Sequence, residues 1–163
     1  MPLPAGSRHA GIRLAGIRPV RRDRPGAGQS DADSGNGSAR VGGMARSLVL
    51  KVTVGKEDPE RCNQVFTVAA AAVASGVPVS VWLTGEASWF ALPDGCPDLS
   101  LPHATPLPDL FATVLRGGMV TLCTQCAARR EITEDDVADG VRIAGATTFV
   151  AEVLAEGAQA LVY

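Results

Sequence analysis

Residues 119–130 read MVTLCTQCAARR, a short apolar run followed at once by a stretch with helical character. Met119–Leu122 predicts a short buried strand, and Thr124–Arg130 predicts the helix that follows it. A strand that leads directly into a helix is the repeating unit of α/β folds. The same alternation continues on both sides of this stretch.

Four other runs have the length and the apolar, β-branched composition of strands. They are Leu48–Val54, Pro78–Leu83, Val141–Ala144 and Ala158–Val162. Helical segments separate them, and acidic residues and a proline mark the start of the first helix. The predicted helices cover Pro59–Gly76, Glu86–Leu92, Pro106–Arg116, Thr133–Val137 (with Thr133 as N-cap) and Thr147–Glu156, while Pro93–His103 is expected to be a loop.

This alternation predicts a flavodoxin-like, three-layer α/β/α fold with a five-stranded parallel sheet. Right-handed crossovers leave few topologies, and the flavodoxin-like strand order 2-1-3-4-5 is the leading expectation. Aromatic residues are only 4% of the chain, so Val, Ala and Leu must build the core. Residues 44–163 are expected to form this single domain.

Residues 1–43 differ from the rest of the chain, because they hold seven Arg against three Asp and are rich in Gly and Ser. Such a composition buries too little apolar surface to fold, so we expect a disordered N-terminal extension. An upstream start codon chosen by mistake, with Met44 as the natural start, would give the same pattern. An Arg-rich transit peptide and a basic nucleic-acid-binding arm are the alternatives, and the interspersed Gly and Asp weaken both.

Residues 44–163 carry 8 Lys/Arg against 14 Asp/Glu, and an acidic body argues against a nucleic-acid partner. The N-terminal piece has no apolar run long enough for a signal peptide or a membrane span, and we expect no membrane partner. Four cysteines without the spacing of a disulfide framework suit a reducing compartment. The expected location is therefore cytoplasmic.

Functional sites of parallel sheets usually lie at the carboxyl ends of the strands. After the first strand, Gly55 is the only glycine and no phosphate-binding motif is present, so no nucleotide or flavin cofactor is expected. Trp89 and Phe90 follow the second strand. They could form the wall of a pocket, contact a second subunit or cap the core, and the sequence leaves these possibilities open.

The third strand ends at Cys123, and Cys126 falls in the first turn of the next helix. A helix N-terminus favours the thiolate, which is the reactive form of cysteine. Arg129 and Arg130 could add positive potential as thiolate-stabilising residues. The spacing also allows the two sulfurs to form a redox-active disulfide, so Cys123 and Cys126 are the candidate catalytic residues.

Other interpretations of the cysteines remain open. The pair could be an inert buried pair, or half of a zinc site completed by Cys96 and His103. Structural zinc sites usually show two tight ligand pairs and the second is missing here, so no metal is expected. Cys62 is in phase with the apolar face of the first helix and is predicted to be core. His103 matters for chemistry only if its loop folds over Cys123.

The strand that ends in Cys123 and the helix that begins TQCAARR resemble the DsrE/DsrF family, which includes the sulfur-relay proteins of tRNA thiolation. Cys123 matches the family cysteine, and Arg129 and Arg130 match its basic pair. The resemblance implies an α/β subunit that forms homo-oligomers, whose cysteine carries a persulfide between a protein sulfur donor and an acceptor. Two features depart from the pattern: Glu131 stands where many relatives have Gly, and Cys126 adds a second thiol.

Sulfur handling is therefore the leading hypothesis for function, with Cys123 as nucleophile and persulfide carrier and Cys126 as resolving thiol. The activity, if the protein is catalytic, would be sulfurtransferase-like. One alternative is a dithiol redox protein that uses the Cys123–Cys126 pair on a scaffold unlike thioredoxin. The other is a non-catalytic structural or regulatory oligomer subunit.

Overall fold

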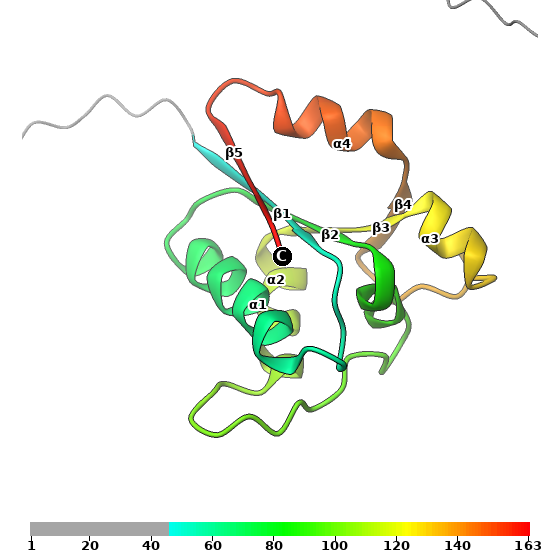
Figure 1. Cartoon of the computed structure of the whole chain (residues 1–163). Coiled ribbons are helices and arrows are strands. Elements are labelled where there is room, and N and C mark those ends of the chain that lie inside the picture. The colour runs from blue at the N-terminus through cyan, green and yellow to red at the C-terminus, as the bar shows by residue number, and fades with distance from the viewer. Residues whose placement is uncertain (1–45) are drawn as a thin grey trace, which may run out of the picture. The chain divides into compact units, whose positions relative to one another are not determined.

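The computed structural model describes residues 46–163 (Figure 1), so the predictions for residues 1–43 lie outside the described part of the chain. Strands and helices alternate along this part, as the sequence predicts. The elements are β1 (Ser47–Val52), α1 (Pro59–Ala74), β2 (Val79–Leu83), the 3₁₀ helix η1 (Gly85–Ala91), α2 (Leu107–Gly117), β3 (Met119–Cys123), α3 (Thr124–Arg129), β4 (Val141–Ala144), α4 (Ala146–Val153) and β5 (Ala158–Val162).

All neighbouring strands pair in parallel, which confirms the predicted five-stranded α/β sheet. The predicted strand order 2-1-3-4-5 is wrong, because the observed order is β4-β3-β2-β1-β5. The chain steps in one direction from β1 to β4 and then crosses the whole sheet to place β5 beside β1. Alternation in a sequence indicates that strands are parallel, but it does not fix the direction of each crossover.

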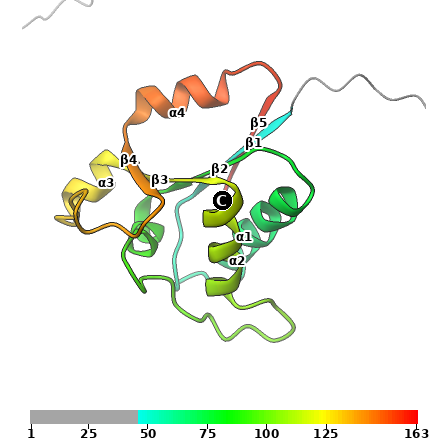
Figure 2. The same cartoon turned by 180° about the vertical axis from the view of Figure 1, so that it is seen from behind.

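The strand order decides which face each helix covers. Successive right-handed crossovers in one direction place α1 and α2 on the same face, and the reversed step from β4 to β5 places α4 on the other (Figures 1 and 2). The face under α1 and α2 is the main core, where Phe111 packs edge-on against Phe66 at 5.6 Å between ring centroids. On the opposite face, Phe149 of α4 packs edge-on against Trp82 of β2 at 5.3 Å.

Local sequence signals explain where α1 begins and ends. The Asp58 side chain caps the helix by accepting a hydrogen bond from the backbone N–H of Arg61 at 3.4 Å, and Pro59 occupies the first turn, where its missing N–H costs nothing. The helix ends just before Gly76, which has a positive φ of 74°.

The predicted helical turn at Thr133–Val137 is wrong, because this segment is a non-helical turn. The carboxylate of Asp136 accepts hydrogen bonds from the Thr133 backbone N–H at 2.8 Å and from its hydroxyl at 2.6 Å. These two bonds lower the pKa of Asp136. A side-chain acceptor three residues ahead gives the backbone an alternative to the helical hydrogen bond.

No helix between residues 46 and 163 is long and apolar enough to span a membrane.

Candidate functional site

Cys123 is the last residue of β3 and lies opposite Ala144 of β4 in the sheet register. The segment that follows β3 returns on the side of α1 and α2, where the Ala138 N–H donates to the Ala91 carbonyl at 2.7 Å. The segment that follows β4 leads instead into α4 on the opposite face. The connections after β3 and β4 therefore leave on opposite faces of the sheet, which makes this strand pair a topological switch point. Ligands of open parallel sheets commonly bind at the carboxyl ends of such a pair.

The Cys126 sulfur lies in a setting that favours its charged form. The residue is only 8% exposed, and its Sγ accepts a hydrogen bond from the Gly85 N–H at 3.4 Å. Burial by itself raises the pKa of Cys126, but the Gly85 N–H, the nearby Cys123 and Ser88 side chains and the charge of Arg130 outweigh burial and lower it. The surroundings of Cys126 therefore favour its thiolate form.

The Gly85 N–H reaches the Cys126 sulfur through a backbone conformation that a larger residue would not tolerate. Its φ is 53°, and a Cβ atom at this position would lie 2.3 Å from the Thr53 carbonyl oxygen. The turn from β2 into η1 therefore depends on glycine. This turn, rather than the dipole of the six-residue helix α3, supplies the N–H that reaches Cys126.

Arg130 is fixed beside the cysteines by three contacts. Its Nη2 pairs with the Glu86 carboxylate at 2.8 Å, its Nη1 donates to the Cys126 carbonyl at 3.4 Å, and its guanidinium lies 5.5 Å from the centroid of the Trp89 ring. Arg129 is exposed and makes no side-chain hydrogen bond or ion pair with any residue from 46 to 163. Of the predicted basic pair, the structure brings only Arg130 to the site.

Two buried donor groups beside Cys126 have no regular hydrogen-bond partner among the described residues. They are the Ser88 hydroxyl, whose residue is fully buried, and Nε of Arg130. Ser88 is close enough to favour the Cys126 thiolate, although its hydroxyl makes no hydrogen bond of normal geometry. Most buried polar groups in proteins are satisfied, so such exceptions require an explanation.

The two aromatic residues after β2 have different environments. Phe90 is 3% exposed and packs edge-on against Phe66 at 6.2 Å, so it caps the core. Trp89 is 43% exposed, and with Lys56 and Glu86 it lines a cavity of about 290 Å³. Trp89 therefore lies both on this cavity and against Arg130.

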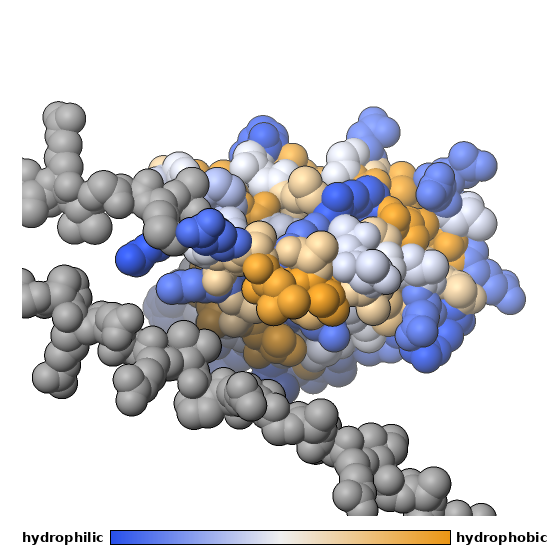
Figure 3. Space-filling model, turned by 90° about the horizontal axis from the view of Figure 1, so that it is seen from above, coloured by the Kyte–Doolittle hydropathy of each residue, from blue (hydrophilic) through white to orange (hydrophobic). Residues whose placement is uncertain are grey.

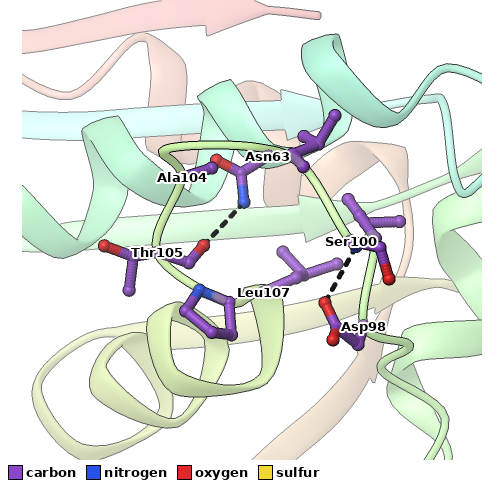
Figure 4. A pocket seen from close by; sticks show the side chains of 9 residues that line it. Asn63, Asp98, Ser100, Ala104, Thr105 and Leu107 are labelled. Carbon is purple, nitrogen blue, oxygen red and sulfur yellow. Dashed lines mark hydrogen bonds between the residues drawn. The ribbon is translucent and has the colours of Figure 1, made fainter.

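His103 does not lie beside the cysteines. It is exposed, has a φ of 61°, and belongs to the loop between η1 and α2, which Figures 1 and 2 both show on the far side of the molecule from α3. A cavity of about 160 Å³ within this loop contains no cysteine or histidine (Figure 4). Its wall is held by the Asn63 amide, which donates to the Thr105 carbonyl at 3.0 Å. The loop therefore takes no part in the cysteine site.

The other two cysteines are separate from the site. Cys62 is fully buried, which confirms the core prediction, and burial raises its pKa to about 12. Burial likewise raises the pKa of Cys96 to about 12. Within residues 46–163, no three His, Cys, Asp or Glu side chains converge as metal ligands, so Cys96 and His103 do not complete a zinc site with the cysteine pair.

Comparisons with known proteins agree with this fold. Residues 46–163 match the model of the DsrE/DsrF-like family. Among solved structures, the chain is similar to the ychN protein from E. coli, with a TM-score of 0.61 and 17% identity over 72% of this chain and 99% of that one. It is also similar to MTH1491 from Methanobacterium thermoautotrophicum, a protein of unknown function, with a TM-score of 0.54 and 12% identity over the same shares. A search of curated proteins found no match.

Proposed function

The chain belongs to the DsrE/DsrF-like family, and from this premise we propose that it handles sulfane sulfur through the Cys123–Cys126 pair. Cys123 is the nucleophile and persulfide carrier, and Cys126 is the resolving thiol. The activity is sulfurtransferase-like, and the donor and the acceptor are proteins of the reducing cytoplasm.

One observation carries this proposal: a partly exposed sulfur lies next to a buried sulfur that accepts a backbone N–H and whose thiolate form is favoured by its surroundings. Cys123 is partly exposed at the strand end, whereas Cys126 is 8% exposed and accepts the Gly85 N–H. A partner protein can therefore reach Cys123, while Cys126 lies behind it. This arrangement supports a division of roles between a loading sulfur and a resolving sulfur.

The loading step is a sulfur transfer between thiols. The Cys123 thiolate attacks the terminal sulfur of a donor persulfide, the S–S bond of the donor breaks, and the donor cysteine leaves as a thiolate. The sulfane sulfur is then bonded to Cys123 as a persulfide. An acceptor nucleophile then attacks the terminal sulfur of the Cys123 persulfide, and Cys123 leaves as a thiolate. The complete relay therefore needs no external oxidant or reductant.

Intact-mass analysis of the full-length protein after incubation with a cysteine desulfurase and cysteine tests the proposal. We expect a gain of one sulfur atom that reductant removes and that digestion maps to Cys123. Cys123→Ser is expected to abolish loading, and Cys126→Ser is expected to prolong it. Equal loading of Cys123→Ser would contradict the proposal. Thiols that react only after unfolding would favour the structural or regulatory oligomer instead.

A second candidate function is a dithiol redox protein, because the Cys123 side chain lies close enough to Cys126 to help lower the pKa of its thiol. Oxidation of the pair would form a disulfide across the first turn of α3. The measurement is the reduction potential of the pair. A value far outside the span of roughly −270 to −120 mV found among thiol oxidoreductases would count against this role.

We also propose that the protein forms a homo-oligomer through the face that carries α4. Helix α4 has no buried residue, and β5 beside it is an edge strand. Figure 3 looks onto this side and shows hydrophobic residues gathered on it. The exposed apolar side chains of this region are Met119 (44%), Val150 (49%), Leu154 (77%) and Val162 (65%). Exposed apolar groups of this kind are typical of surfaces that another subunit covers.

A further inference from the structure

We propose that Gly85, Ser88 and Arg130 form a cradle that holds Cys126 as an anionic sulfur, and that this cradle sets the rate at which Cys126 attacks a persulfide on Cys123. Ser88 and Arg130 are positioning residues in this reaction, because they act through Cys126. The persulfide part of the inference rests on the proposed function. The existence of the cradle does not.

The three residues reach Cys126 from two directions. Gly85 and Ser88 come from η1, which follows β2, and Arg130 comes from the end of α3. The Gly85 N–H donates to the sulfur at 3.4 Å, and the guanidinium of Arg130 is held near it by Glu86 and Trp89. Because Cys126 is only 8% exposed, little solvent is available to replace these groups around the sulfur.

Another cysteine of the same chain shows what burial does without such donors. Cys62 is fully buried with the carboxylates of Glu57 and Asp58 nearby, and its pKa rises to about 12. Cys126 is also buried, yet its pKa falls. For Cys62 burial is the largest cause and the nearby carboxylates add to it, whereas for Cys126 the hydrogen-bond donors and the positive charge of Arg130 outweigh burial.

The donors without partners indicate that the cradle is built for negative charge. Within residues 46–163, the buried Ser88 hydroxyl and Nε of Arg130 have no hydrogen-bond acceptor of normal geometry. Both residues act on the Cys126 sulfur, and both favour its charged form. A neutral thiol is a much weaker acceptor than a thiolate and compensates buried donors less well.

The cradle promotes a reaction in which Cys126 releases sulfide from the Cys123 persulfide and forms a disulfide with Cys123. The Cys126 thiolate attacks the inner sulfur of the Cys123 persulfide, the bond between the inner and terminal sulfurs breaks, and the terminal sulfur leaves with the electron pair as hydrosulfide. The sulfane sulfur is reduced to sulfide, and the two cysteines are oxidised to a disulfide. A dithiol reductant would return the pair to its starting state.

The first test measures how fast Cys126 reacts with iodoacetamide as a function of pH, in full-length protein that carries Cys123→Ala. With Cys123 replaced, the charged group that acts on the Cys126 sulfur within residues 46–163 is Arg130, which is paired with Glu86. We expect Ser88→Ala and Arg130→Met each to move the reactivity midpoint about one unit higher and to slow alkylation roughly tenfold at pH values well below the midpoint of the parent. Arg130→Lys should restore part of the rate.

Arg116→Met is the matched control, because Arg116 is an exposed arginine on α2 whose side chain contacts only Thr113 of its own helix. It should leave the profile unchanged. Far-UV circular dichroism and thermal unfolding establish that each variant is folded, and Arg130→Met alone decides the matter if Ser88→Ala does not fold. A profile in Arg130→Met identical to that of the parent would overturn the cradle.

The second test follows sulfide release from protein with both cysteines after loading by a desulfurase. With release normalised to the amount of loaded Cys123, we expect Ser88→Ala and Arg130→Met to release sulfide more slowly, by the same factor by which each slows alkylation of Cys126 at the pH of the assay. Unchanged release in variants with slower alkylation would refute the role of the cradle in this step. If wild-type Cys123 never loads, the proposed function fails, while the alkylation profile still decides whether the cradle exists.

Discussion

Replacement of Glu152 by Gln should loosen the helix that covers the second face of the sheet. The Glu152 carboxylate on α4 accepts hydrogen bonds from the Ser80 hydroxyl at 2.7 Å and from Nε1 of Trp82 at 2.7 Å, and it forms an ion pair with Arg142. No residue of α4 is buried. These polar contacts, the packing of Phe149 on Trp82 and the Lys51 ammonium over the Phe149 ring therefore hold the helix on the sheet.

The size of the effect follows from the exposure of each partner. Trp82 is 2% exposed, so its hydrogen bond to a charged acceptor contributes about 1.5–3 kcal/mol. The Arg142 side chain is 40% exposed, so its ion pair contributes at most about 1 kcal/mol. Gln keeps one acceptor oxygen and loses the charge, which gives an expected loss of about 2 kcal/mol. For a domain of this size the loss corresponds to a Tm about 8 °C lower.

The pH dependence gives a second check. Burial raises the pKa of Glu152, but the hydrogen bonds from Trp82, Ser80 and Arg142 outweigh it and hold the pKa below the ordinary value of 4.5. A carboxylate with a lowered folded pKa stabilises the fold fully above its unfolded pKa and loses this effect as the pH falls through the folded value. The difference between wild type and Glu152→Gln should therefore be full at pH 7 and should shrink below pH 4.5.

Urea denaturation followed by circular dichroism at several pH values measures both quantities. Glu156→Gln is the control, because Glu156 is exposed just beyond α4 and takes part in no ion pair within the described chain. The reasoning is refuted if Glu152→Gln unfolds within about 0.5 kcal/mol of wild type at pH 7. It is also refuted if the difference between the two proteins does not change between pH 7 and pH 4.

Three further outcomes are expected. Gly85→Ala places a Cβ atom 2.3 Å from the Thr53 carbonyl, so it should cost at least about 1–2 kcal/mol in urea denaturation and should slow alkylation of Cys126; equal stability would show that the turn relaxes freely. Leu154→Lys adds charge to a side chain that is 77% exposed on the α4 face, so it should reduce the oligomer mass in light scattering at an unchanged monomer stability; an unchanged mass would place the interface elsewhere. With pKa values raised to about 12, Cys62 and Cys96 have roughly one thiolate in 10⁴ at pH 8, so peptide mapping should find them alkylated only after denaturation; rapid labelling of native protein would contradict this low thiolate fraction.

Most of the fold could be predicted from the sequence because its signals are local. The β-branched run at Leu48–Val54 and the acidic and proline residues before α1 each act within a few residues, and the structure places elements there. The strand order could not be predicted, because the step of β5 across to β1 depends on which edge of the sheet is free. That choice is made by packing of whole elements, which leaves no local pattern.

In the candidate site, too, the residues with a local sequence signal could be predicted, and those brought in by strand pairing could not. Cys123 and Cys126 carry a local signal, since both lie where a strand turns into a helix. Gly85 and Ser88 were not predicted to be site residues, because they lie about forty positions earlier and reach Cys126 only through the pairing of β2 with β3. The sequence TGEAS after a strand was a weak signal that becomes informative only when that pairing is known. Arg129 and Arg130 look equivalent in the sequence, and the contact with Glu86 separates them.

The second thiol changes what a persulfide on Cys123 can do. A carrier needs that persulfide to survive until an acceptor arrives, whereas an ionised Cys126 beside it would convert it to sulfide and a disulfide. The two fates are compatible only if acceptor binding is faster than attack by Cys126, or if the acceptor separates the two sulfurs. Because Cys126 is 8% exposed and Cys123 lies at the open strand end, an acceptor can contact the persulfide without touching Cys126. The lifetime of the loaded state without an acceptor would therefore decide between a relay and a sulfide-releasing reductase, and under the proposal above the cradle around Cys126 would set that lifetime.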